Sequence, residues 1–191
     1  MASSLQGAKI AILVADGFEQ VELSEPRKAL KEAGAQTAVV SPAQGKVKGW
    51  NHTQWGEELD VDVPLDRADA NDYQAILLPG GVMNPDKLRQ LPAAVEFVRS
   101  FIDAGKPAAV ICHGAWTLIE AGAVAGKQMT SYPSLRTDLK NAGAQWVDEE
   151  VVEDRGLISS RRPDDLPAFI EKMLQAFAES RGRGKEVHSH A

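Results

Sequence analysis

The stretch Ala108-Ala-Val-Ile-Cys112-His113-Gly114 decides the fold class of this chain. Its apolar run is typical of a short strand that is buried on both faces of a parallel sheet. The run leads directly into Cys112, and residues 115–121 behind it have helical composition and stop at Gly122. We therefore expect a strand, a sharp turn that carries the cysteine, and then a helix.

The same alternation of strand and helix recurs along the chain. Short apolar runs predict the strands, and helical spacing of apolar residues predicts the helices between them. The predicted strands are residues 9–15, 36–41, 75–78, 108–111, 151–152 and 157–159, and the predicted helices are residues 19–33, 92–104, 115–121, 133–142 and 163–180. Residues 42–66 are expected to form a hairpin or loop layer at the sheet edge. This order predicts an α/β sandwich with a mostly parallel sheet, whose ligand site lies at the carboxyl ends of the strands.

The length of 191 residues is that of one domain. We assign residues 1–180 to a single α/β domain and residues 181–191 to a polar C-terminal tail. The net charge of −6 argues against nucleic acid and anionic membranes as partners. The sequence has no apolar run long enough to span a bilayer and begins without the features of a signal peptide, so a cytoplasmic location is expected.

Cys112 is the only cysteine of the chain, so it has no partner for an intrachain disulfide. Its place between a strand end and a helix start puts the sulfur near free backbone amides and the positive end of the helix dipole, which favours the thiolate. This predicts a lowered pKa for the Cys112 thiol, with His113 beside it as an acid or base. The alternative is a buried structural cysteine next to a histidine that points to the surface.

A second strand ends at Pro79-Gly80-Gly81, where the glycines allow a tight turn whose amides face a ligand, as an oxyanion hole requires. An ordinary turn is the alternative. Glu19 and Glu22 stand three residues apart at the start of the first helix, where both can face the same edge of the sheet. Acidic residues also simply suit a helix N-terminus. Trp116 lies one turn after Cys112 and is expected to form a wall of the same pocket.

The sequence lacks the glycine patterns that hold nucleotide phosphates. No Gly-x-Gly-x-x-Gly follows the first strand, and a P-loop is absent. Four histidines and one cysteine offer no structural zinc set, and His188 and His190 in the tail are more simply polar residues than metal ligands. We therefore expect neither a cofactor nor a metal.

The cysteine stretch is one of several segments that together resemble a known family. The others are Gly17-Phe-Glu-Gln-Val-Glu-Leu23, Ala75-Ile-Leu-Leu-Pro-Gly-Gly81, Gly105-Lys-Pro107, Thr130-Ser-Tyr-Pro133, Asn141-Ala-Gly-Ala-Gln-Trp-Val147 and Ser159-Ser-Arg161. In this order they resemble the PfpI (intracellular protease I) family of the ThiJ/PfpI superfamily, of the general stress protein type and related to the parkinsonism-associated deglycase. The resemblance covers about residues 9–178.

This resemblance implies a flavodoxin-like three-layer sandwich, of the class I glutamine amidotransferase-like type, with a reactive cysteine at a strand-to-helix elbow. Glu22 matches the family carboxylate that contacts the sulfur, and a carboxyl that shares a hydrogen bond with sulfur must itself be largely protonated. Gly81 and His113 match the positions whose amides form the oxyanion site. Glu19 and Tyr132 match residues near the same pocket.

In PfpI-type relatives, an acid after the Pro-Gly-Gly turn reaches the histidine of a neighbouring subunit. Asp86 stands at that position, where the archaeal proteases carry Glu. The resemblance therefore implies a homodimer or a higher homo-oligomer, in which Asp86 approaches His113 of another chain.

Three functions fit these residues. The leading one is a general stress-response enzyme, a cysteine-dependent hydrolase, deglycase or glyoxalase, in which Cys112 adds to a small carbonyl substrate or a glycated adduct and Glu22 or His113 moves protons. The first alternative is an intracellular cysteine peptidase that acts on protein or peptide through Cys112, His113 and Asp86. The second is a redox sensor or chaperone in which Cys112 becomes oxidised.

Overall fold

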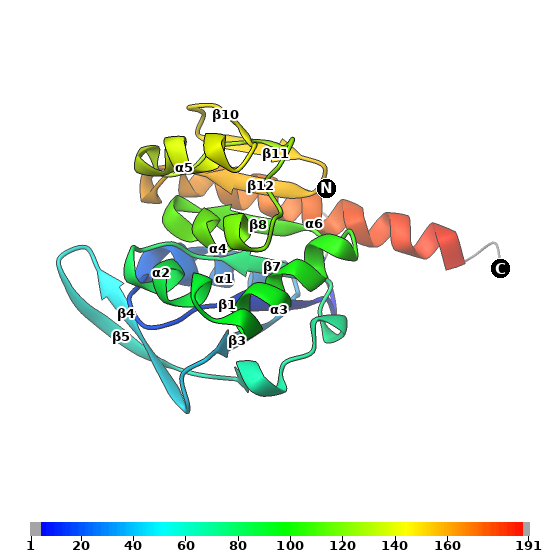
Figure 1. Ribbon diagram of the computed structural model, residues 1–191. Coiled ribbons are helices and arrows are strands. Elements are labelled where there is room, and N and C mark those ends of the chain that lie inside the picture. The colour runs from blue at the N-terminus through cyan, green and yellow to red at the C-terminus, as the bar shows by residue number, and fades with distance from the viewer. Residues whose placement is uncertain (1–4, 189–191) are drawn as a thin grey trace.

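A seven-stranded sheet forms the middle layer of the structure, which is a computed structural model that describes residues 5–188 and the side chains of residues 5–182 (Figure 1). The strands follow one another in the order β11 (Val151–Asp154), β12 (Leu157–Ser160), β8 (Ala108–Ile111), β7 (Ala75–Leu78), β1 (Lys9–Leu13), β3 (Gln36–Ser41) and β6 (Val63–Pro64). Only the β11 edge strand pairs antiparallel, with β12, and all other pairs of this sheet are parallel. The predicted α/β sandwich with a mostly parallel sheet is therefore confirmed.

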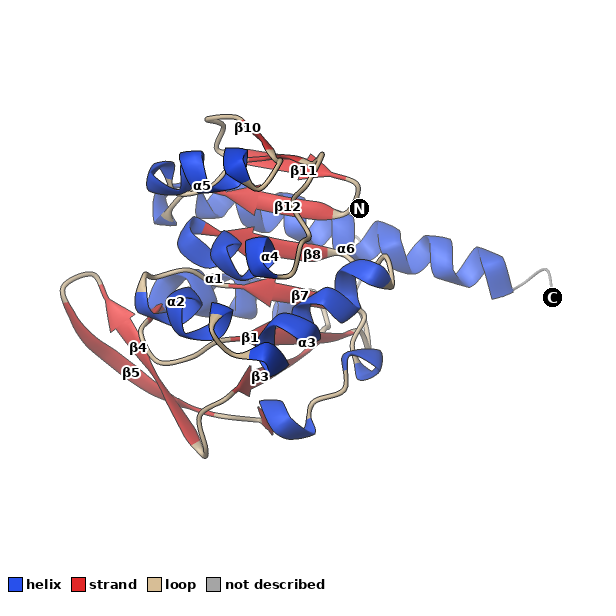
Figure 2. Ribbon diagram, viewed as in Figure 1, coloured by secondary structure: helices blue, strands red, loops and turns tan. Residues whose placement is uncertain are grey.

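Helices cover both faces of the sheet, as Figure 2 shows. The first face is covered by α1 (Gln20–Glu32) and α6 (Leu166–His188), which pack against each other. The opposite face carries α2 (Met83–Arg89), α3 (Pro92–Asp103), α4 (Ala115–Glu120) and α5 (Arg136–Asn141). No helix within residues 5–188 is both long enough and apolar enough to cross a membrane.

The central strands β1, β7 and β8 are almost entirely apolar because alternate side chains supply two separate cores. In β1, Ile10 and Ile12 pack on the side of α1 and α6, whereas Ala11 and Leu13 pack on the side of α3 and α4. All four side chains are at most 1% exposed. The buried runs read in the sequence thus reflect a sheet that is covered on both sides.

Residues 42–66 include the expected hairpin, formed by β4 (Lys46–Asn51) and β5 (Gln54–Asp60). This hairpin projects to one side of the main sheet (Figure 1). Its strand β4 also pairs with the short β2 (Phe18–Glu19), so that Glu19 lies opposite Trp50. The hairpin is therefore attached to the segment that joins β1 to α1. A further short pair is formed by β9 (Gln128–Met129) and β10 (Gln145–Trp146).

The largest differences from the sequence prediction are in two helices, and the sequence also predicts no strand at β9 or β10. The pattern of residues 83–89 predicts no helix, yet α2 forms there around the buried Asn84 and Pro85. The last helix was predicted to end at residue 180, but α6 continues to His188. The predicted polar tail is thus helical in its first part, and residues 189–191 lie outside the described residues.

Candidate active site

Cys112 occupies a strained turn at the carboxyl end of β8. Its φ of +63° lies in the left-handed region, which is costly for a residue with a side chain and is common where a site demands it. The single 3-10 turn η3 (Cys112–Gly114) then leads into α4. At Gly114 an added Cβ would lie 2.7 Å from the Leu78 carbonyl oxygen, so glycine is required for this turn to lie against β7. The structure therefore contains the expected elbow.

The Cys112 sulfur lies among backbone donors from two strand ends. The amides of Gly81 and His113 both donate hydrogen bonds to it. Gly80 lies against the same residue, since an added Cβ on Gly80 would lie 2.6 Å from the Cβ of Cys112. The turn after β7 is therefore packed directly against the elbow after β8.

Glu22 is a completely buried carboxyl beside this sulfur. It is 0% exposed, its Oε2 accepts a 2.8 Å hydrogen bond from the Gly80 amide, and its Oε1 has no hydrogen-bond partner among the described residues. Burial raises the pKa of Glu22 from 4.5 to about 8, and the charge of Glu19 adds to this increase. Glu22 is therefore mostly protonated at neutral pH.

The prediction of a lowered pKa for the Cys112 thiol is wrong in this structure. Burial raises the pKa of the thiol, and a charge on Glu22 raises it further, while the Gly81 and His113 amides act in the opposite direction. The sequence argument rests on free backbone amides and a helix dipole, but α4 has only six residues and Cys112 is only 7% exposed. Activation of this thiol therefore requires a base that takes its proton during the reaction.

His113 is positioned to be that base. Its Nδ1 lies 3.2 Å from the Cys112 sulfur, and its Nε2 lies 3.2 Å from the Oγ of Ser134. Burial lowers the pKa of His113, so the imidazole is neutral and able to accept a proton near pH 7. Tyr132 stacks on the ring with centroids 4.6 Å apart, and Trp116 meets it edge-on at 5.2 Å.

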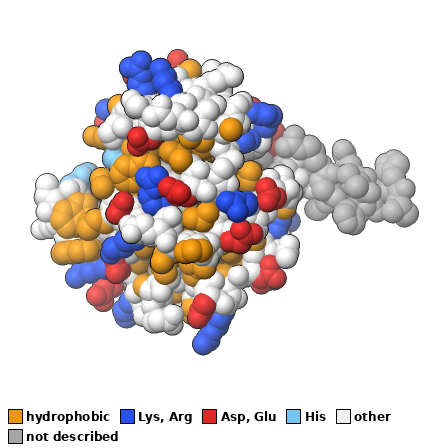
Figure 3. Space-filling model, viewed as in Figure 1, with side chains coloured by type: hydrophobic (Ala, Val, Ile, Leu, Met, Phe, Trp, Pro, Cys, Tyr) orange, Lys and Arg blue, Asp and Glu red, His pale blue; other side chains and the backbone are white. Residues whose placement is uncertain are grey.

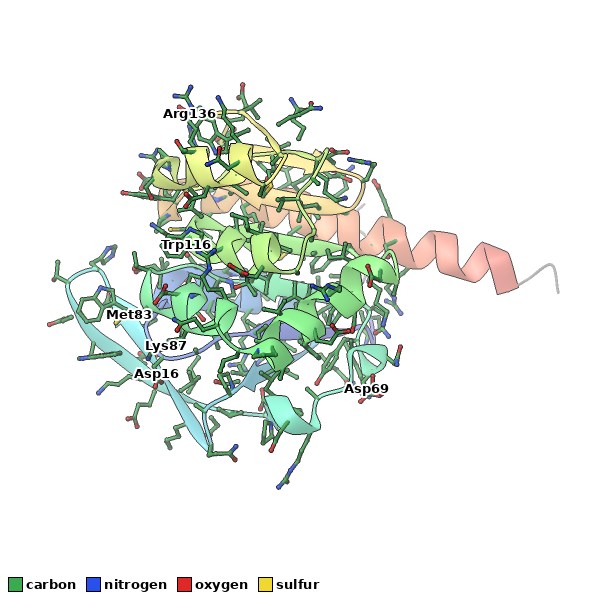
Figure 4. All side chains as sticks on the ribbon, in the orientation of Figure 1. Asp16, Asp69, Met83, Lys87, Trp116 and Arg136 are labelled. Carbon is green, nitrogen blue, oxygen red and sulfur yellow. The ribbon has the colours of Figure 1, made fainter. Side chains whose placement is uncertain are left out.

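A cavity of about 480 Å³ opens above Cys112. Its walls combine both glutamates with aromatic and histidine side chains and with the start of α2. The lining residues are Gly17, Glu19, Glu22, Trp50, His52, Gly81, Val82, Met83, Cys112, His113, Tyr132 and Pro163. In Figure 4, Met83 lies on the side that faces the β4–β5 hairpin, and Figure 3 shows hydrophobic side chains gathered over that hairpin. The cavity is large enough for a small organic substrate.

This site stands on a fold with many relatives. Residues 8–176 match the DJ-1/PfpI family. The chain belongs to the DJ-1/PfpI family. It is 44% identical over 171 residues to General stress protein 18 of Bacillus subtilis, an alignment that covers 88% of this chain and 96% of that protein.

Other relatives agree with this assignment. Protein/nucleic acid deglycase 2 of Escherichia coli is 40% identical over 170 residues, which cover 87% of this chain and 96% of that protein. Among solved structures, DJ-1beta of Drosophila melanogaster superposes with a TM-score of 0.81 at 26% identity, over 95% of this chain and 98% of that one. The flavodoxin-like sandwich is thus shared with known members of the DJ-1/PfpI family.

Five of the residues expected at the site lie together at the cavity. They are Glu19, Glu22, Gly81, Cys112 and His113. Tyr132 joins them through its stacking on His113 and is 38% exposed at the cavity wall.

Three expected site residues are placed differently. The Gly80 amide is bonded to Glu22 Oε2, so it is not a free oxyanion donor. Trp116 lies behind His113 and does not line the cavity, and its Nε1 donates to Asp138 at 3.0 Å. Asp86 is an exposed residue of α2 whose Oδ2 lies 3.4 Å from the Gln90 side chain.

Asp86 is not among the residues that line the cavity.

Sequence reasoning missed two residues that support the site. Ser134 directly follows residues 130–133, which belong to the family resemblance. Nothing in the sequence indicates that this exposed serine contacts a histidine 21 residues away. Asn84 is 0% exposed, and its Oδ1 accepts from the Ala15 amide while its Nδ2 donates to the carbonyls of Pro79 and Gly80. Only a position inside an apolar periodic pattern would have identified Asn84 as buried, and α2 has no such pattern.

Metal ligands do not gather among the described side chains. Within residues 5–182, no three His, Cys, Asp or Glu side chains come together as a metal site. The side chains of His188 and His190 lie outside this range.

Proposed function

We propose that this protein is a cytoplasmic cysteine-dependent enzyme of the stress response that acts on carbonyl groups, either in reactive dicarbonyls or in glycated adducts. The observation that carries the proposal is the Cys112 sulfur in a cavity of about 480 Å³, with the neutral His113 Nδ1 3.2 Å away. A soft sulfur nucleophile beside a neutral base suits reversible addition to a carbonyl carbon.

The addition step is balanced within the site. The thiol proton of Cys112 passes to Nδ1 of His113, and a bond forms between the sulfur and the carbonyl carbon. The carbonyl π electrons move to the substrate oxygen, which takes up the proton and completes a hemithioacetal. Glu22, which keeps its own proton up to about pH 8, stays neutral and avoids a second negative charge beside the developing thiolate.

Two relatives support this choice by their names. General stress protein 18 and Protein/nucleic acid deglycase 2 each match about nine-tenths of this chain at 40% identity or more. The same sulfur chemistry would serve a deglycase and a glyoxalase, because both begin with an aldehyde or ketone carbon or its amine adduct.

Turnover of methylglyoxal and of a methylglyoxal-treated N-acetylarginine adduct tests the proposal. We expect the wild-type protein to convert at least one of them and Cys112→Ser to lose roughly 1000-fold or more of that rate. Ser100→Ala, a change at the surface of α3, is the matched control and should keep the full rate. Equal turnover by wild type and Cys112→Ser, or none by either, would contradict the proposal.

A redox sensor is the second candidate, and the buried Glu22 carboxyl at the same cavity as the Cys112 sulfur favours it. A protonated carboxyl beside sulfur can donate to a sulfinate oxygen as well as to a thiolate. Peroxide titration followed by intact-mass analysis separates the two candidates. A sensor accumulates the sulfinate in wild type and less of it in Glu22→Gln, with no turnover of either carbonyl substrate.

We also propose that a second copy of the chain covers the face around α2. Asp86 is exposed there, and the apolar side chains of Val82 and Leu91, at the two ends of α2, are 54% and 36% exposed. A two-fold contact would bring Asp86 toward the pair formed by Ser134 and His113 in the other chain.

Light scattering tests this assembly. We expect a mass of at least twice 20.6 kDa, and a lower rate for Asp86→Asn with assembly intact. A fully active monomer would contradict the shared site.

A further inference from the structure

Four residues of its own chain contact the imidazole of His113. Cys112 lies at Nδ1 and Ser134 lies at Nε2, each at 3.2 Å. Tyr132 stacks on the ring face and Trp116 meets its edge. These contacts fix the position of the ring. The remaining question is which of its two nitrogens carries the proton.

The hydrogen-bonding capacity of the two neighbours decides that choice. A neutral imidazole carries one N–H and one acceptor nitrogen. A thiol is a weak donor and a weaker acceptor, so it pairs best with an unprotonated Nδ1. The proton then resides on Nε2, where the Ser134 hydroxyl oxygen has lone pairs to accept it.

We propose that Ser134 is a positioning residue that holds His113 in the Nε2–H tautomer and so keeps Nδ1 free to take the Cys112 proton. This inference rests on the proposed roles of Cys112 and His113. When the thiol proton moves to Nδ1, the imidazolium keeps its Nε2–H bond to Ser134, so no donor or acceptor has to be exchanged during the step.

The segment that carries Ser134 is anchored to the cysteine elbow itself. The Tyr132 amide donates to the Cys112 carbonyl at 3.2 Å, and the Leu135 amide donates to the Tyr132 carbonyl at 3.0 Å within the turn η4 (Pro133–Leu135). Leu135 is 0% exposed and fixes the turn in the core. Ser134 is thus tied to both the residue before the histidine and the apolar layer beneath it.

Nitrogen NMR of protein with ¹⁵N-labelled histidine tests the proposal without substrate. Wild type should show the proton of His113 on Nε2 and none on Nδ1 at a pH where the ring is neutral. Ser134→Ala should show a mixture of tautomers, and Ser134→Thr, which keeps a hydroxyl, should restore the wild-type pattern. Thr137→Ala removes an exposed hydroxyl from the neighbouring α5 and is the matched control, which should match wild type.

Alkylation of Cys112 by iodoacetamide at pH 7 gives the functional readout. Loss of one ordinary hydrogen bond is expected to slow the rate about 5-fold to 10-fold in Ser134→Ala, with recovery in Ser134→Thr. A proton on Nδ1 in wild type would overturn the proposal, and so would a tautomer and a rate that Ser134→Ala leaves unchanged. Because no turnover is measured, a failed carbonyl assay would refute the proposed function and leave this result standing.

Discussion

The turns after β7 and β8 lie side by side at the same edge of the sheet, and they differ in how their strain and their hydrogen bonds are arranged. The β8 turn places Cys112 at a φ of +63° and holds the reactive atoms. The β7 turn, residues 79–81, contains no reactive side chain, but its groups bond to Glu22, Asn84 and the Cys112 sulfur. The comparison teaches that the strained turn at Cys112 packs against a second turn whose backbone groups are held by buried hydrogen bonds.

Removing the side chain that holds the β7 turn should have the largest effect on stability. Asn84→Ala deletes the bonds to the Ala15 amide and to the Pro79 and Gly80 carbonyls, all of them buried. We expect a loss of about 4 kcal/mol in the free energy of unfolding, measured by urea titration. Asn71→Ala, at an exposed position, should stay within about 0.5 kcal/mol of wild type. A stable Asn84→Ala protein would show that the β7 turn does not need this support.

Filling the contact between the two turns should have the next largest effect. Gly80→Ala places a Cβ 2.6 Å from the Cβ of Cys112 and 2.6 Å from the Glu22 Oε2 atom. We expect thermal unfolding to show a loss of about 3 kcal/mol and the carbonyl turnover to be lost with it. Gly182→Ala has no atom within 4 Å of the new Cβ and is the control, with an expected gain of up to about 1 kcal/mol in α6. A fully active Gly80→Ala protein would show that activity does not depend on the close contact between the two turns.

The buried carboxyl between the turns should make stability depend on pH. The pKa of Glu22 rises from 4.5 to about 8 on folding, so its proton stabilises the folded state below about pH 4.5, and this contribution disappears as the pH rises through 8. We expect the free energy of unfolding of wild type to fall by roughly 2 kcal/mol or more between pH 5 and pH 9. Glu22→Gln should remove most of this fall, whereas Glu19→Gln should keep it.

The same pair of variants tests the thiol. A charge on Glu22 raises the pKa of Cys112, so Glu22→Gln should move the alkylation profile of Cys112 to lower pH than in wild type. Glu19→Gln should move it less. Identical profiles in all three proteins would show that Glu22 does not influence the pKa of the Cys112 thiol.

The strain of the β8 turn should give the smallest effect. Cys112→Gly and Cys112→Ala both remove the sulfur, but only glycine adopts a φ of +63° without steric cost. We expect Cys112→Gly to be about 1 kcal/mol more stable than Cys112→Ala in urea unfolding. A reversed order would show that the turn stores no strain.

The sequence predicted most of the sheet because apolar runs such as residues 75–78 and 108–111 are local signals of doubly covered strands. It also placed Cys112 at a turn, since the strand before it and the helix after it are both visible in the pattern. Helix α2 escaped prediction because it is short and its one buried polar residue, Asn84, bonds to a residue 69 positions away. A contact between residues so far apart produces no periodic pattern in the sequence.

What the sequence determined by itself is the order of strands and helices and the cysteine at the end of one strand, because these follow from local periodicity and turn chemistry. The tertiary structure alone decided the protonation of the site. Burial raises the pKa of Glu22 and of Cys112, whereas the hydrogen bond from the Gly80 amide, 58 residues from Glu22, acts in the opposite direction on Glu22. The Ser134 partner of His113 likewise arises where two distant segments meet. Solvent exclusion and through-space charge depend on the packed chain, and no single stretch of residues encodes them.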